Sequence, residues 1–240
     1  MIPSWQKRSY RNWTKEKGLI LTRIAILETD LQILTDKPID KNRARKKISS
    51  LRGDIEAYIQ KDKKFSASLK PIPIELNARP VIKEMSKAAH KAGVGPMAAV
   101  AGAIAQSLGK SLLKDGLKEV IIENGGDIFL KTKKTRYVSI YAGKSKLLNN
   151  KLFIKIKPGQ TPIGICTSSG TVGHSLSFGS ADAVVILAKN AALSDAAATA
   201  CANLVNTKED FNRAIGLAKK IRGVSGIIVI LDNNIACWGD

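Results

Sequence analysis

The stretch Glu123–Asp127, with the sequence ENGGD, combines two carboxylates and an amide with two glycines. Glycine allows positive φ angles and a close approach of the backbone to a ligand. An ordinary hairpin turn is the alternative, because Asn-Gly is a standard turn sequence. Since Glu123 follows the apolar run VII, its charge needs a partner at the end of a buried strand. The candidate ligand contacts are Glu123, Asn124, Gly125, Gly126 and Asp127.

A second stretch, Cys166–Ser175 (CTSSGTVGHS), gathers hydroxyls, a thiol, two glycines and one of only two histidines. Such a loop can present many hydrogen-bond donors to a phosphate or a polar ring. A mobile Ser/Gly surface loop is the alternative. Cys166 is a candidate nucleophile, although a lone cysteine is more often a small core residue. The candidates are Thr167, Ser168, Ser169, Gly170 and Thr171 for ligand contact, and Cys166 and His174 for catalysis.

The third stretch, Leu193–Ala200 (LSDAAATA), follows a predicted strand, and Ser194 or Asp195 is expected to start a helix. Asp195 and Thr199 are four residues apart, so their side chains share one helix face. Their oxygens are hard ligands that suit Mg²⁺, which takes its other ligands from water and phosphate. We predict that Asp195 and Thr199 bind magnesium and that Asp195 is catalytic; a helix cap is the alternative for Asp195.

A fourth stretch, Gly93–Ala105 (GVGPMAAVAGAIA), opens a helix predicted from about Pro96 to Leu113. Unbonded N–H groups at a helix start, preceded by two glycines, can bind an anion. Tight packing of small residues is the alternative. Gly95 and Met97 are the candidate ligand contacts here.

Hydrophobic periodicity predicts the elements that must position these stretches. Strands are expected in a hairpin over 18–35, on both sides of Gly125–Gly126, at YVSIYAG, KLFIKIK and ADAVVILA, and in a final hairpin of GIIVIL and NIACWG. Helices are expected over 40–64, 81–93, 96–113, 193–206 and 208–220, and a Gly/Ser-rich loop over 164–179.

Each half thus has the order strand, strand, helix, helix, strand, strand. This order predicts a duplicated α+β fold whose sheets share one core. We expect residues 1–17 to form a basic extension and residues 18–240 a single domain of two halves, about 18–160 and 161–240. The Glu123–Asp127, Cys166–His174 and Asp195–Thr199 stretches are expected to meet in one cleft, because polar groups at buried element ends need partners.

The chain of 240 residues has a formal net charge of +19, with basic residues concentrated before Pro71 and between Lys131 and Lys157. Nucleic acid, an acidic protein or a phosphorylated ligand would suit this charge, and a solvated lysine-rich surface is the alternative. The sequence argues against nucleic acid, because aromatic residues for base stacking are scarce on the predicted strands. Three widely spaced cysteines without a CxxC pair fit a reducing cytoplasm. No segment suits a signal peptide or a membrane span.

The four motifs, in this order, resemble those of the ApbE-like superfamily, whose best-known branch is the FAD:protein FMN transferases. A smaller branch with ENGGD, CTSSGTVGHS and DAAAT motifs is closer, and the resemblance covers about residues 16–240. It implies a T-fold type of duplicated fold with its site at the seam between the halves. It also implies FAD or another nucleotide as ligand, with Asp195 and Thr199 holding Mg²⁺ against a pyrophosphate.

Two features depart from the transferase pattern. The transferase segment H-x-x-D-P-x-T-G-x-P is shortened or absent after His174, and Gln106 stands where a lysine is expected. Two functions therefore stay open. The first is that the protein binds a flavin or nucleotide with Mg²⁺ and acts on a phosphate or pyrophosphate bond. The second, which the resemblance to the smaller branch implies, is a non-catalytic accessory protein in sulfur assimilation (sulfide transfer toward homocysteine). An acidic protein partner and a homo-oligomer are compatible with both.

Overall fold

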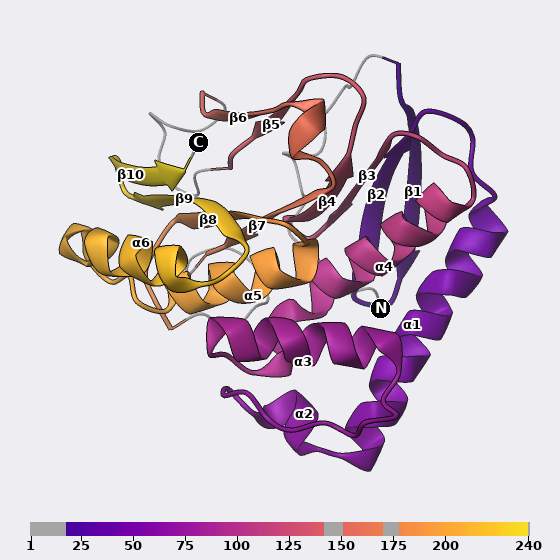
Figure 1. The fold of residues 1–240 in the computed structure, drawn as a ribbon, viewed down its shortest axis with the longest axis horizontal. Coiled ribbons are helices and arrows are strands. Elements are labelled where there is room, and N and C mark those ends of the chain that lie inside the picture. The colour runs from indigo at the N-terminus through magenta and orange to yellow at the C-terminus, as the bar shows by residue number, and fades with distance from the viewer. Residues whose placement is uncertain (1–17, 142–150, 170–177, 240) are drawn as a thin grey trace.

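A computed structural model describes residues 18–141, 151–169 and 178–239, and its main feature is one antiparallel sheet (Figure 1). Eight strands form it in the order β1-β2-β3-β4-β7-β8-β9-β10, and β5 pairs with β6 in a separate two-stranded sheet. The strands are β1 (Ile20–Ile26), β2 (Thr29–Thr35), β3 (Val120–Asn124), β4 (Asp127–Lys131), β5 (Arg136–Ser139), β6 (Phe153–Ile156), β7 (Ile163–Ser168), β8 (Ala183–Ala188), β9 (Val224–Leu231) and β10 (Asn234–Gly239).

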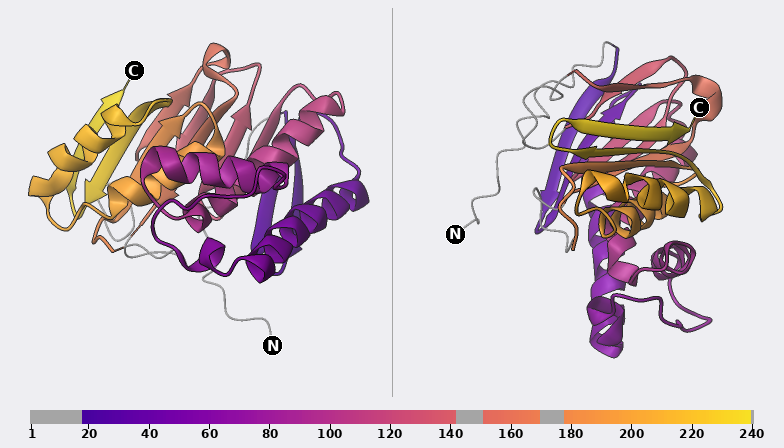
Figure 2. Two further views of the ribbon diagram at one scale, coloured as in Figure 1. Left: turned by 60° about the horizontal axis from the view of Figure 1, so that its bottom comes forward. Right: turned by 90° about the vertical axis from the view of Figure 1, so that its left-hand side faces the viewer.

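The helices lie on one face of the main sheet, as the two views of Figure 2 show. Their apolar sides and the facing strand residues form the larger core, and a second core on the opposite face lies under β5 and β6. The helices are α1 (Lys41–Lys61), α2 (Lys64–Ala67), α3 (Pro80–Ala92), α4 (Val100–Lys114), α5 (Ala191–Ala202) and α6 (Phe211–Lys220), with 3-10 turns at Pro96–Ala99, Pro158–Gln160 and Lys208–Asp210.

The duplicated α+β fold predicted from the sequence is confirmed. Helices α1 to α4 lie between β2 and β3 in the chain, and α5 and α6 lie between β8 and β9. In each half the strands before and after the helices pair with each other, β2 with β3 and β8 with β9. Because β4 also pairs with β7, the two sets of four strands join edge to edge into one continuous sheet.

Helix α1 begins and packs as its sequence predicts. The Asp40 carboxylate accepts hydrogen bonds from the N–H groups of Asn42 and Arg43 and so caps the helix. Ala44, Ile48, Leu51 and Ile55 recur every three or four residues and are buried on the face toward the sheet. Helix α3 ends as predicted at Gly93, whose φ of +74° is readily adopted only by glycine.

The predicted loop over 164–179 is wrong for its first residues, because Ile163–Ser168 form the buried strand β7. Gly164 was interpreted as a loop residue, but in the structure the missing side chain allows close packing. A Cβ atom there would lie 2.4 Å from the Cα atom of Ala191 in α5. The small residue lets the helix lie directly on the strand.

The starts of two helices also differ from the predictions. Pro96–Ala99 form a 3-10 turn, and the α-helix begins only at Val100. Helix α5 begins at Ala191, because the Asn190 side chain accepts the Leu193 N–H and caps it, so neither Ser194 nor Asp195 is the first helical residue.

In the described part of the chain no single helix is long and apolar enough to span a membrane. Helix α3 and the following 3-10 turn plus α4 pass that test only as a pair, and the pair is bent by 105°.

The close crossing of α4 over α5 at Gly102 gives a test of the packing. An alanine Cβ there would lie 2.3 Å from the Ala191 carbonyl oxygen. We expect Gly102→Ala to lower the free energy of unfolding by about 1–3 kcal/mol, as overpacking does. Gly53→Ala in the exposed part of α1, where nothing lies within 4 Å, should raise it by roughly 0.5–1 kcal/mol. Urea denaturation measures both, and equal stability of the two variants would contradict the crossing.

Candidate functional site

A cluster of buried polar side chains lies on the helix-covered face of the sheet, around the join of the two halves. The strand register sets Asn124 opposite Asp127, and Asp127 opposite Cys166. Directly opposed residues point to the same face, and so does Ser168, two residues after Cys166. All four are buried. Residues from two of the predicted stretches therefore lie next to each other.

The ENGGD stretch forms a two-residue hairpin turn, so the alternative considered for it is correct about its backbone. Gly125 and Gly126 connect β3 to β4 with φ angles of +68° and +105°. The Glu123 carboxylate accepts the Gly126 N–H at 2.8 Å, which gives its charge a partner within the turn. The Thr167 N–H donates to the Gly126 carbonyl at 3.3 Å, so the turn lies against β7.

The strands do not bring all predicted residues to one side. Because successive side chains alternate between the faces of a sheet, Glu123 and Thr167 point away from the helices, toward the face that carries β5 and β6. Gln32, which stands opposite Glu123 on β2, lies on this same face, and its buried side-chain nitrogen has no partner within the part of the chain that the structure describes. The hairpin therefore offers different side chains to its two faces.

Asp195 links the second half of the chain to the first. Its carboxylate Oδ2 accepts the Gly102 N–H at 2.8 Å, and the Ala101 N–H donates to the same carboxylate. Both N–H groups belong to the first turn of α4, so Asp195 caps α4 from the neighbouring helix α5. The Asn124 side-chain amide donates to the Ala101 carbonyl at 3.1 Å. The start of α4 thus joins the hairpin to α5.

The surroundings of this cluster change the pKa values of two groups. Burial raises the pKa of the Asp195 carboxyl from 3.8 to about 7, although the Gly102 and Ala101 hydrogen bonds favour the charged form. Burial also raises the pKa of the Cys166 thiol well above its usual value, and the negative charges of Asp127 and Asp195 add to this effect. Burial therefore favours the neutral form of both groups.

Cys166 has the surroundings of a core residue. It is fully buried, and its thiol donates to the Ala191 carbonyl at 3.4 Å. Reactive cysteines are partly exposed and have a lowered pKa. The predicted catalytic role of Cys166 stays a prediction, and its surroundings do not support it.

The other predicted site residues that the structure describes lie on α5, before α4 and after β7. Thr199 lies one turn after Asp195 on α5 and is 9% exposed. Gly95 serves backbone packing, because a Cβ there would collide with the Ser68 carbonyl oxygen, and Met97 packs against the larger core. Ser169 is half-buried after β7. Gly170, Thr171 and His174, like the proposed basic extension 1–17, lie outside the described residues.

Two groups that the structure brings to this site were not predicted from the sequence, namely the backbone N–H groups of Ala101 and Gly102. The run of small residues before Ile104 was the signal for them. Ser168, which the sequence did predict, has a buried hydroxyl without a hydrogen-bond partner among the described residues. Within the described residues no group of three or more His, Cys, Asp or Glu side chains could hold a metal ion.

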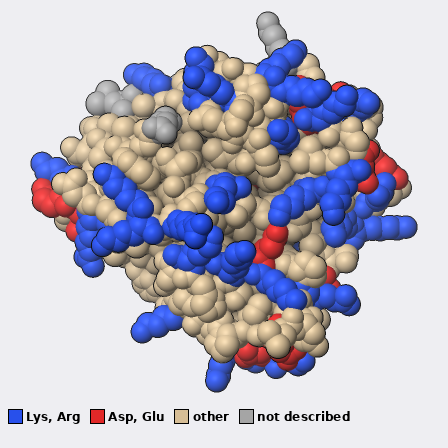
Figure 3. Space-filling model, in the orientation of Figure 1, with Lys and Arg blue, Asp and Glu red and all other residues tan. Residues whose placement is uncertain are grey.

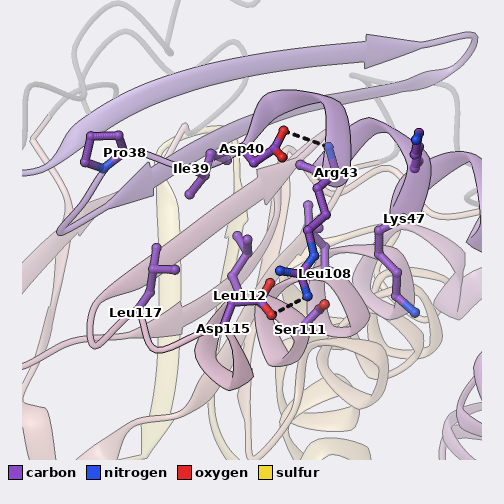
Figure 4. A pocket seen from close by; sticks show the side chains of 12 residues that line it. Pro38, Ile39, Asp40, Arg43, Lys47, Leu108, Ser111, Leu112, Asp115 and Leu117 are labelled. Carbon is purple, nitrogen blue, oxygen red and sulfur yellow. Dashed lines mark hydrogen bonds and ion pairs between the residues drawn. The ribbon is translucent and has the colours of Figure 1, made fainter.

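A separate cavity of about 440 Å³ lies between the start of α1 and the end of α4 (Figure 4). Arg43 crosses it to Asp115 in an ion pair of 2.7 Å, above an apolar floor that includes Leu108 and Leu112. None of the predicted site residues that the structure describes lines this cavity. It is about 20 Å from the polar cluster, since α4 has 15 residues and the cluster lies at its other end.

Solved structures with a similar arrangement of strands and helices define the class of fold. The flavin transferase ApbE of Vibrio cholerae superposes with a TM-score of 0.62 at 13% identity, over 92% of this chain and 96% of that one. The flavinyl transferase ApbE of Pseudomonas stutzeri gives 0.60 at 10% identity, over 92% and 94%. At such low identity the likeness shows the fold alone, which is the ApbE fold that the motifs predicted.

Sequence relatives define the family. UPF0280 proteins of Methanococcus aeolicus and Methanosarcina acetivorans are each 40% identical to this chain, over 89% and 88% of it and over 87% and 83% of their own lengths. The UPF0280 protein of Methanocaldococcus jannaschii is 40% identical over 90% of this chain and 89% of its own. The family model described as AbpE bacteria matches residues 11–227, and the chain belongs to this family. The predicted ApbE-like assignment is confirmed.

The raised pKa of Asp195 predicts a pH dependence of stability. The folded protein holds this proton up to about pH 7, whereas the unfolded chain releases it near 3.8. Between these values the folded state binds more protons, so its stability falls as the pH rises. We expect Asp195→Asn, which keeps an oxygen for the Gly102 N–H, to lose less stability than the wild type from pH 5 to pH 8.

Urea unfolding of both proteins at these two pH values, without divalent ions, measures the difference. Asp54→Asn on α1, whose carboxylate forms a partly exposed ion pair with Arg79, serves as control and should follow the wild type. Equal pH dependence of Asp195→Asn and wild type would mean that Asp195 titrates at its ordinary pKa.

Proposed function

We propose that the protein binds a flavin or another nucleotide, with Mg²⁺, where α4, α5 and the β3–β4 turn meet, and acts on a phosphate or pyrophosphate bond. One observation carries the proposal. The Asp195 carboxylate of the second half reaches the first turn of α4 in the first half at 2.8 Å, beside the strands that carry Asp127 and Ser168. A carboxylate at a helix start and a backbone turn without side chains are suited to a cation and a phosphate.

The residues present fit magnesium. Mg²⁺ binds proteins through one or two carboxylates and completes its shell with water and phosphate, so a cage of three or more acidic or imidazole ligands is not required. Asp195 and Thr199, one helical turn apart, would hold the ion. Burial raises the pKa of Asp195 to about 7, and a bound cation would favour its charged form. When bound, the ion would neutralise charge that develops on a phosphate.

The chain's own groups would bind and orient the rest of the ligand. Gly125 and Gly126 expose backbone without Cβ atoms, so a ligand can approach the turn closely. The Ser168 hydroxyl is buried and lacks a hydrogen-bond partner within the described residues, so it can bond to a polar group of a ligand. Similar solved structures that are called flavin and flavinyl transferases add support for a flavin.

A non-catalytic accessory function is the second candidate, and Gln106 favours it. Gln106 stands where the transferases carry a lysine, and its amide is used inside the protein. The nitrogen donates to Glu84 at 2.8 Å and the oxygen accepts the Ala191 N–H at 2.9 Å. This side chain therefore holds α3, α4 and α5 together. A role in sulfur assimilation would rest on Cys166, whose thiol is buried.

For either function we propose a cytoplasmic protein with an acidic protein as partner. The three cysteines are unpaired, and Cys166 and Cys201 are buried thiols. A reducing compartment keeps such thiols reduced. The net charge of +19 suits an acidic surface on a partner.

Titration calorimetry with FAD, with Mg²⁺ or with EDTA, tests the proposed function. We expect Mg²⁺-dependent binding that Asp195→Asn and Thr199→Val each weaken at least about tenfold, the size of one lost charge-assisted contact. Asp54→Asn should bind as the wild type does. AMP release from FAD then separates catalysis from binding alone. Binding that is equal in EDTA, or unchanged in Asp195→Asn, would leave Asp195 with only its capping role.

A further inference from the structure

The two-stranded sheet of β5 and β6 presents aromatic rings to solvent. Its register sets Tyr137 opposite Lys155 and Ser139 opposite Phe153. Tyr137 is 57% exposed and Phe153 is 56% exposed. Directly opposed and diagonal residues share a face, so the two rings are diagonal neighbours, roughly 7–8 Å apart at their Cα atoms. The alternate residues, among them Ile154 and Ile156, face the main sheet and pack in its second core.

The surroundings of these rings are strongly basic. Residues 128–181 contain eight lysines and one arginine but no aspartate or glutamate. In the described part of this segment Lys133, Lys134, Lys151, Lys155 and Lys157 are exposed. Lys and Arg gather over β5 and β6 in Figure 3, without Asp or Glu beside them. The nearby Glu119 is buried and forms an ion pair with Arg136 at 3.1 Å, so it does not offset the surface charge.

Rings and lysines that alternate on one face fit a polyanion that carries flat aromatic groups. Bases of every type stack on tyrosine and phenylalanine, while lysines neutralise the phosphates. A second copy of this chain would set lysines against lysines. An acidic protein segment would satisfy the charge but would not require the rings. Aromatic residues are few in the sequence, yet folding places two of them beside lysines on one exposed face.

We propose that the outer face of β5 and β6 binds single-stranded nucleic acid, with bases stacked on Tyr137 and Phe153 and phosphates at the surrounding lysines. This face lies on the side of the main sheet opposite α4 and α5. The proposal is therefore independent of the flavin or nucleotide site, and nucleic acid binds without Mg²⁺ or FAD.

Fluorescence anisotropy with labelled 20-nucleotide oligo-dT and oligo-U at low salt tests the proposal on the full-length protein. Because each stacked base contributes substantially to binding, we expect the double variant Tyr137→Ala/Phe153→Ala to bind at least about tenfold more weakly. Phe178→Ala, at an equally exposed ring (61%) far along the chain, is the matched control and should bind as the wild type does. Both substituted rings are exposed, so the melting temperature should stay within a few degrees.

Two further measurements separate stacking from charge. Lys133→Gln/Lys155→Gln should weaken binding. It should also make the slope of the logarithm of the binding constant against the logarithm of the salt concentration shallower by roughly one to two. Inorganic polyphosphate should compete more weakly than an oligonucleotide with the same number of phosphates. Unchanged binding by the double aromatic variant, equal competition by polyphosphate, or binding of poly-glutamate with no binding of either oligonucleotide would each overturn the proposal. The last result would indicate an acidic protein partner.

Discussion

The contact between the Asp195 carboxylate and the first turn of α4 is the constraint on which the rest of the site depends. The first N–H groups of a helix have no partner within it, and here a side chain from another helix supplies one. For this, α4 and α5 must cross closely, which requires glycine at 102. The crossing also places α5 directly on β7 at Gly164. One electrostatic contact and two glycines thereby fix the seam between the halves.

The same carboxylate serves both stability and the proposed chemistry. Two N–H groups favour its charged form, but burial outweighs them and raises the pKa to about 7. A carboxyl in this state exchanges its proton for a cation at little cost near neutral pH, since either one neutralises the charge. A structural cap and an ion ligand are therefore compatible roles for Asp195.

The main sheet separates two kinds of surface. Its helix-covered face carries the polar cluster of Asn124, Asp127 and Cys166, where buried groups need partners. Its other face carries β5 and β6, with exposed rings and lysines. Because side chains alternate along a strand, a single strand such as β3 contributes to both faces. The two ligands proposed for these faces would therefore not compete for the same residues.

The sequence by itself determined the α+β class, the succession of strands and helices apart from β7, and most helix boundaries, because these depend on local periodicity and capping. It also determined that Asp195 and Thr199 share a helix face. The tertiary structure decided that Gly164 lies in a strand, that Asp195 caps α4, and that Glu123 and Asp127 point to opposite faces. These features depend on what lies across the sheet or the helix crossing. A glycine that makes room for a neighbouring backbone has the same local sequence signal as a glycine in a loop.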